Sequence, residues 1–409
     1  MNSGERNDVL IIGAGPAGSV AGAVLARSGR SVLCLERGYF PRHVIGESLL
    51  PRCNALLEQA GMLQAVQSRG YMVKSGAVFV RGDRKVRFCF AEAMNGDPPD
   101  TFQVPRDDFD QLLAVESRRA GVDLRYGQQV EEVEFERGEV QATVTDLERD
   151  RRYEVRARFV LDCSGFGRVL PRLLQLERPS PLPSRVSCFT QVEGDIRPKD
   201  ELEGDIWICC HPVNGWIWII PFTNGRTSIG MVCDPDHWQG MSGSNREKLF
   251  QYLYEEPNAK ARLANAVPVA PTRTIEGFSK KAKALHGEGW ALVGNASDFL
   301  DPVFSSGVTL ALETAVLAAG LVDRTLGGEA VHWHEEYDQV LHKAVGVFQA
   351  FVESWYRADL QDIFFSGTRL PRINRFITSI LGGHVLRMDN PLVTDPENAL
   401  RELYQAASA

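Results

Sequence analysis

Three glycines near the start of the chain have the spacing of a phosphate-binding turn. Gly13, Gly15 and Gly18 form a GxGxxG pattern directly after the apolar run Val9–Ile12. Glycine lets backbone N–H groups approach a pyrophosphate closely, and the start of the following helix stabilises its charge. A second apolar run ends at Glu36, eighteen residues after Gly18, where a carboxylate can accept hydrogen bonds from a ribose. This order of strand, glycines, helix, strand and acid predicts a dinucleotide site rather than a simple tight turn.

Two tryptophans at alternate positions predict a strand with one bulky face. In a strand, Trp216, Trp218 and Ile220 share one face. Ile217 and Ile219 then share the other face. Aromatic and β-branched residues are common in strands, so this stretch alone favours a sheet buried on both sides, with the indoles as core.

Lys74 lies between apolar Val73 and small Ser75-Gly76, which is compatible with a partly buried site. Its amine is a hydrogen-bond donor when protonated and a nucleophile when neutral, and burial shifts its pKa readily. Most lysines are solvated at the surface, and without further support that is the better interpretation of Lys74.

Four later segments favour FAD over NAD as the dinucleotide. They are a Gly-Glu-Ser turn, a Pro-Arg helix start, a strand ending in an acid and a glycine turn, and a late strand running into an Asp-Pro loop. In this order the segments are Gly46–Ser48, Val104–Asp110, Phe159–Gly165 and Trp290–Pro302. The arrangement resembles the FAD enzymes that include the aromatic hydroxylases, the geranylgeranyl reductases and the flavin-dependent halogenases.

That resemblance implies that Arg106 and the Asp301-Pro302 loop lie along FAD. Asn295 stands where the class usually carries an acid that binds the ribityl chain, and an amide can make the same hydrogen bond. The residues expected to bind the cofactor are Gly13, Gly15, Ala17, Gly18, Glu36, Arg37, Glu47, Ser48, Arg106, Asn295, Asp301, Pro302 and Gly307.

Three motifs in the right order resemble the flavin-dependent halogenases over roughly the first 330 residues. The first is W-x-W-x-I-P, the second is F-x-x-P-x-x-S-x-G, and the third is a lysine in a K-x-G-A-x-F setting. They fall on Trp216, Trp218, Ile220 and Pro221, on Phe299, Pro302, Ser305 and Gly307, and on Lys74.

The resemblance implies that reduced FAD, O2 and a halide, either chloride or bromide, give hypohalous acid. The backbone amides of Ser306 and Gly307 are the expected halide site, because a Ser-Ser-Gly turn can aim N–H donors at an anion. Ser305 belongs to the same turn, where a serine is also an ordinary helix N-cap, and both roles are compatible. Lys74 would carry the halogen to the arene, while Trp216 and Trp218 would separate the arene from the flavin.

The resemblance also suggests a branch. Tryptophan halogenases keep a glutamate just before the serine of the second motif, and here that position is Phe304. The chain is closer to the branch that acts on phenols and pyrroles, some of whose members take substrates tethered to a carrier protein. The base that removes the ring proton is not assigned. No obvious reductase domain is left in 409 residues, so a separate flavin reductase is expected to supply reduced FAD.

These residues need an α/β fold: a Rossmann-like FAD-binding domain, an inserted antiparallel-sheet substrate domain and a helical C-terminal segment. The stripe Val345, Phe348, Val352 and Trp355 predicts a helix that faces the core. A functional alternative is that this helix and Phe364-Phe365 cover the arene site. The expected division is 1–70, 101–170 and 281–330 for FAD, 71–100 and 171–280 for the substrate-side sheet, and 331–409 for the helices.

Composition excludes several other classes of protein. The formal net charge is −8 with no basic stripe, which argues against nucleic acid as the main partner. Eight cysteines without a C-x-x-C pattern indicate reduced thiols in a cytoplasmic protein. The N-terminus does not resemble a signal peptide, and no apolar run is expected to span a membrane. The group His332–Glu336 lacks metal-ligand spacing and is read as a solvated helix face, so no metal is expected.

Three alternatives share the fold or the cofactor. A reductase of carbon–carbon double bonds, like the geranylgeranyl reductases, would need neither Lys74 nor a halide. An aromatic monooxygenase would oxidise NAD(P)H directly. A flavin-binding relic would have lost its sites, which the intact Lys74 and tryptophan motif argue against. A halide requirement separates the halogenase from all three.

Overall fold

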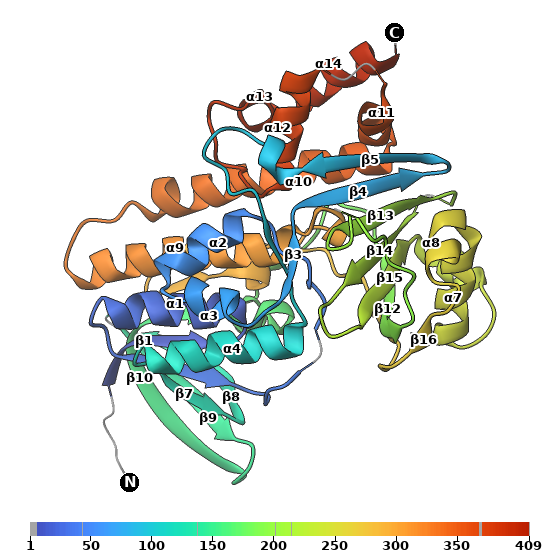
Figure 1. Cartoon of the computed structure of the whole chain (residues 1–409). Helices are drawn as coiled ribbons and strands as arrows, with labels where there is room; N and C mark the ends of the chain where they lie inside the picture. The colour runs from blue at the N-terminus through green and yellow to red at the C-terminus, as the bar shows by residue number, and fades with distance from the viewer. Residues whose placement is uncertain are drawn as a thin grey trace.

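Two eight-stranded sheets organise the described part of the chain (Figure 1). The computed structural model describes residues 6–42, 44–136, 138–200, 202–213, 215–367 and 370–408. Residues 1–5, which belong to the start expected to lack a signal peptide, lie outside these ranges.

The first sheet has a parallel centre, in which β10 and β2 pair with β1, and β20 and β7 extend the two sides. Its central strands are largely buried: every residue of β2 is buried, and so are the last four residues of β1. In spatial order the strands are β19 (His286–Gly287), β20 (Trp290–Leu292), β10 (Arg151–Asp162), β1 (Arg6–Ile12), β2 (Val32–Glu36) and β7 (Asp123–Tyr126), with β9 (Glu139–Asp146) and β8 (Gln128–Glu136) extending from β10.

The second sheet is mainly antiparallel and separates two hydrophobic cores. Trp216, Trp218 and Ile220 belong to the main core, whereas Ile217 and Ile219 belong to the smaller one under α7. The predicted alternation is therefore confirmed, and so is burial on both faces. In spatial order the strands are β16 (Val267–Pro268), β12 (Val186–Glu193), β15 (Thr227–Cys233), β14 (Gly215–Pro221), β13 (Ile206–His211), β4 (Gly76–Arg81) and β5 (Arg84–Cys89), with β17 (Arg273–Glu276) beside β12.

Two small ribbons join these layers: β3 (Met72–Lys74) pairs with β6 (Thr101–Gln103), and β11 (Glu177–Pro179) pairs with β18 (Lys280–Ala282). We propose that the two large sheets mark the FAD-side and substrate-side units, with 71–100 and 171–280 forming the latter.

Helices cover the first sheet and close the top of the molecule (Figure 1). α1 packs on α9 and α4, and α10 crosses above them toward α11 and α14. The helices are α1 (Pro16–Arg27), α2 (Arg52–Gln59), α3 (Leu63–Gln67), α4 (Arg106–Arg119), α5 (Val169–Leu173), α6 (Pro235–Gly240), α7 (Asn245–Glu255), α8 (Pro257–Arg262), α9 (Ser306–Leu326), α10 (Gln339–Tyr356), α11 (Asp359–Phe365), α12 (Pro371–Leu381), α13 (Pro391–Thr394) and α14 (Pro396–Ser408).

Helix α9 differs from expectation, because it is long and apolar enough by composition to cross a membrane. Of its most apolar stretch, 67% is buried inside the protein, where the helix packs on α1 and α2. Such burial is typical of the core helix of a globular protein. The predicted fold class, an α/β fold with an added antiparallel sheet and a helical C-terminal segment, is confirmed.

Candidate active site

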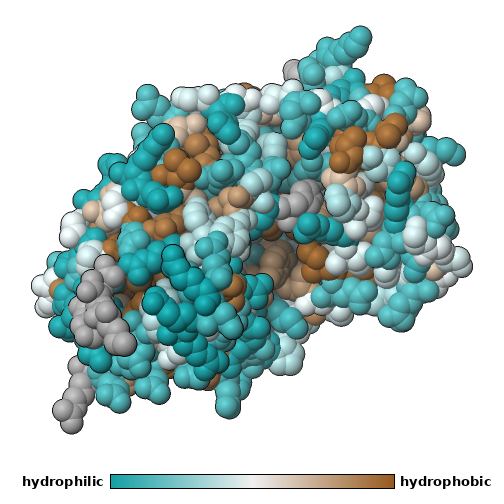
Figure 2. Space-filling model, turned by 90° about the horizontal axis from the view of Figure 1, so that it is seen from below, coloured by the Kyte–Doolittle hydropathy of each residue, from teal (hydrophilic) through white to brown (hydrophobic). Residues whose placement is uncertain are grey.

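A cavity of about 760 Å³ lies between the two sheets. The view from below shows the surface hollowed between the two lobes (Figure 2). Most of the predicted site residues line this cavity: Gly13, Gly15, Ala17, Glu36, Arg37, Glu47, Ser48, Arg106, Trp216, Trp218, Asn295, Pro302, Ser305 and Gly307. Four others, Gly18, Lys74, Asp301 and Ser306, lie behind its wall.

The glycine turn has the geometry of a phosphate cradle. Gly13 has φ +96°, and a Cβ there would lie 2.8 Å from the carbonyl oxygen of Cys163. A Cβ on Gly18 would lie 1.9 Å from the oxygen of Gly13, so only glycine lets α1 approach β1 this closely. Gly15 begins α1 without a side-chain cap, which leaves first-turn amides for an anion. These features fit the pyrophosphate of FAD.

Hydrogen bonds hold Glu36, the acid at the end of β2, in place. Glu36 accepts hydrogen bonds from the backbone N–H groups of Ala14 at 2.8 Å and Gly38 at 2.9 Å. Arg42 donates to the same carboxylate at 3.2 Å and also lines the cavity. Arg42 was missed from the sequence, although a cation six residues beyond the acid was a usable clue.

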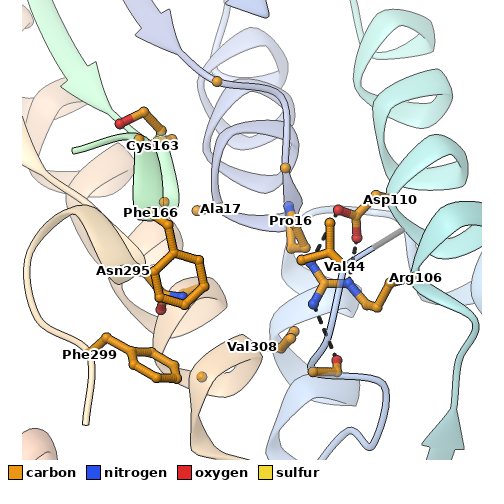
Figure 3. A pocket seen from close by; sticks show the side chains of 18 of the residues that line it. Pro16, Ala17, Val44, Arg106, Asp110, Cys163, Phe166, Asn295, Phe299 and Val308 are labelled. Atoms are coloured by element: carbon orange, nitrogen blue, oxygen red, sulfur yellow. Dashed lines mark hydrogen bonds and ion pairs between the residues drawn. The ribbon is translucent and has the colours of Figure 1, made fainter. Parts of the chain in front are cut away.

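Arg106 organises the cavity wall from α4. Its guanidinium binds both carboxylate oxygens of Asp110, at 2.6 and 3.1 Å, and donates to the carbonyl of Ile45 at 2.7 Å. Asp110 was not predicted, yet the i,i+4 spacing on a helix would have indicated it. Figure 3 shows this pair beside Val44 and Pro16, with Phe166, Asn295 and Phe299 across the cavity.

The two indoles on β14 are held by hydrogen bonds to hydroxyl groups. Trp216 Nε1 donates to the Tyr356 hydroxyl at 3.1 Å, and Trp218 Nε1 donates to Ser228 Oγ at 3.2 Å. On the next strand, a Cβ at Gly230 would lie 2.2 Å from the Trp218 ring, so glycine makes room for that indole. Neither hydroxyl was predicted: Tyr356 lies 140 residues from Trp216, and Ser228 lies on β15, the strand that pairs with β14.

Two carboxyl groups next to these hydroxyls are buried. Burial raises the pKa of Glu47 to about 7, although hydrogen bonds from Ser228 and Gln191 oppose the shift. Burial likewise raises the pKa of Asp301 to about 6, opposed by the hydrogen bond from Tyr356. Glu47 lines the cavity and can therefore hold a proton there near neutral pH.

The Ser-Ser-Gly turn joins the Asp-Pro loop to α9. Ser305 has φ +55° and stands at the N-cap of α9, but its side chain makes no cap hydrogen bond. Ser305 thus occupies the expected N-cap position without the side-chain hydrogen bond of an ordinary cap, and this part of the turn keeps its amides free of a side-chain acceptor. Ser305 and Gly307 line the cavity, whereas Ser306 is buried behind them.

Lys74 is buried, so the surface interpretation is wrong. Lys74 is only 1% exposed, and its Nζ donates to the carbonyl of Leu49 at 2.8 Å. Nζ also lies 5.3 Å from the centre of the Phe90 ring. Burial lowers the pKa of Lys74 to about 7, so much of the amine is neutral at physiological pH. Leu49 follows Ser48, so a short segment separates Lys74 from the cavity.

Aromatic rings fill the core under α10 and α11. Phe79 contacts Phe88, Trp355 and Phe364 at centroid distances of 5.7, 5.6 and 4.8 Å. Phe304 also contacts Trp355 at 5.9 Å. The predicted stripe on α10 is buried here and faces the core, as the safer interpretation held.

Comparisons with known proteins agree with this geometry. Residues 6–346 match the family described as FAD binding domain. A tryptophan 2-halogenase of Chondromyces crocatus is 31% identical over 335 residues, which cover 80% of this chain and 63% of that protein. The chain thus spans less than two-thirds of that relative.

Two further matches cover almost the whole chain. A 1H-pyrrole-2-carbonyl-[peptidyl-carrier protein] chlorinase of Pseudomonas fluorescens is 27% identical, with 92% of this chain and 89% of that protein covered. The crystal structure of a flavoprotein/dehydrogenase from Cytophaga hutchinsonii is 39% identical, with a TM-score of 0.95 and 99% of both chains covered. The chain therefore belongs to the FAD binding domain family.

Proposed function

We propose that the protein is a halogenase that uses reduced FAD to chlorinate or brominate an electron-rich phenolic or pyrrolic ring. The observation that carries this proposal is the pair of indoles, Trp216 and Trp218, on the wall of the cavity that also holds the Ser305–Gly307 turn. A bulky wall beside an anion-binding turn suits chemistry in which the organic substrate is kept away from the flavin.

When bound and reduced, FAD supplies the electrons with which O2 oxidises a halide to hypohalous acid. The backbone amides of Ser306 and Gly307 would hold the halide, and the indoles would exclude the arene. The neutral amine of Lys74 can then take the halogen from hypohalous acid, releasing water, and pass it to the ring. Phe304 replaces the glutamate of tryptophan halogenases, which favours a ring that needs less help from a base.

Substrate and partners follow from the same proposal. Lys74 is only 1% exposed, so an arene would reach its amine only after neighbouring side chains move. A substrate tethered to a carrier protein is compatible with this, since the similar Pseudomonas protein acts on a carrier-bound pyrrole by its name. A separate flavin reductase would supply reduced FAD in the cytoplasm.

The test is an assay of hypohalous acid with FAD, NADH, a generic flavin reductase and O2. Bromide-dependent bromination of monochlorodimedone is the expected result. Oxidation of reduced flavin at a rate indifferent to bromide, with all of the consumed O2 recovered as hydrogen peroxide, would contradict the proposal.

A flavin-dependent reductase of carbon–carbon double bonds is the second candidate. Burial of Lys74 favours it, because such an enzyme needs no accessible lysine. The similarity to a protein named flavoprotein/dehydrogenase points the same way. Bromide-independent consumption of reduced FAD by an added alkene substrate would support this candidate.

A further inference from the structure

Tyr356 lies where α10 meets both the tryptophan wall and the 301–307 turn. Its hydroxyl donates to Asp301 Oδ2 at 2.8 Å and accepts from Trp216 Nε1 at 3.1 Å. The ring lies against the guanidinium of Arg185, with 4.1 Å between the guanidinium carbon and the ring centre. Burial and the Asp301 carboxylate raise the pKa of Tyr356 well above its ordinary value, so the hydroxyl keeps the proton that it donates.

Asp301 links the Tyr356 hydroxyl to the turn. Its other oxygen accepts from the Val303 N–H at 3.0 Å and so fixes the short 3-10 turn Pro302–Phe304. Ser305 follows in the left-handed conformation, and its N–H donates to the Pro302 carbonyl at 3.0 Å. A Cβ at Gly307 would lie 3.2 Å from the Phe299 ring, so the backbone of the turn packs closely on this ring.

We propose that Tyr356 is a positioning residue that sets the halide-binding turn at a fixed distance from the Trp216 indole. The Tyr356 hydroxyl connects the turn to the indole. It accepts from Trp216, 140 residues away in the sequence, and donates to Asp301, 55 residues away. This inference rests on the proposed halogenase function. Tyr356 itself is not among the residues that line the cavity, so it acts through its two partners.

Tyr356→Phe removes the hydroxyl and keeps the ring against Arg185. Loss of one hydrogen-bond link is expected to raise the KM for bromide roughly fivefold to tenfold, with kcat and FAD binding changed by less than about twofold. In the FAD-free chain, amide exchange of Val303 and Ser305 should become faster. Tyr337→Phe is the matched control, since this buried hydroxyl donates to the Leu292 carbonyl and should leave both readings unchanged.

The two measurements, the KM for bromide and amide exchange, distinguish failure of this inference from failure of the proposed function. An unchanged KM for bromide together with unchanged amide exchange would overturn the role of Tyr356. If the wild-type protein shows no bromide dependence, the halogenase proposal fails. Amide exchange alone then tests whether Tyr356 holds the turn. Faster exchange in Tyr356→Phe but not in Tyr337→Phe then still supports the link, and equal exchange rejects it.

Discussion

At the scale of single residues, the burial of Lys74 makes the free energy of unfolding depend on pH. Its pKa of about 7 lies below the ordinary value of 10.5, so between these values the unfolded chain binds more protons than the folded chain. The free energy of unfolding therefore rises with pH through this window. Lys74→Met should be more stable than the wild type by roughly 2 to 4 kcal/mol near pH 6, and this advantage should shrink toward pH 10. Urea denaturation across this range tests it, and a pH-independent difference would contradict it.

The pH dependence of stability that Glu47 contributes has the opposite sign. Its pKa of about 7 lies above the ordinary value of 4.5, so the folded chain binds more protons between these values and loses stability as pH rises. Glu47→Gln cannot ionise and should gain stability over the wild type by up to about 3 kcal/mol from pH 5 to pH 8. Thermal unfolding of the FAD-free chain measures this gain. Glu58→Gln on the exposed face of α2 should show no such trend.

At the scale of elements, the contact between α1 and β1 builds the cofactor site. Gly18→Ala places a methyl group 1.9 Å from the Gly13 oxygen and must push the helix away from the strand. We expect lost FAD binding and a destabilisation of about 2 kcal/mol or more. Gly320→Ala in α9 meets open space and should be neutral or stabilising by up to about 1 kcal/mol. Flavin fluorescence and thermal unfolding distinguish the pair, and equal effects would contradict the account.

Local patterns allowed the elements to be predicted, whereas contacts between distant elements could not be. The glycine cradle and the alternation on β14 are properties of neighbouring residues. Alternation also predicts that Val73 and Lys74 face opposite ways, but only packing decides that Val73 is 52% exposed and Lys74 is 1% exposed. Tyr356 reaches Trp216 across 140 residues, and no periodicity contains that contact.

At the scale of the whole molecule, the chain should depend on a separate electron donor. The glycine cradle is assigned to FAD, so NADH has no expected binding site of its own. With FAD and O2, the purified chain should oxidise NADH no faster than FAD alone, and a flavin reductase should restore turnover. Spectrophotometry at the NADH band measures the rates. Rapid NADH oxidation by the chain alone would favour an aromatic monooxygenase.

The central claim is that Lys74 delivers halogen to an aromatic ring. The most direct measurement is mass spectrometry of a phenol panel after single turnover of reduced FAD with O2 and bromide. Lys260→Met, on the exposed side of α8, is the control for loss of a lysine. Brominated product should form with the wild type and Lys260→Met, and should fall by about a hundredfold or more with Lys74→Met. Hydroxylated or reduced product that ignores bromide, or bromination that survives in Lys74→Met, would contradict the claim.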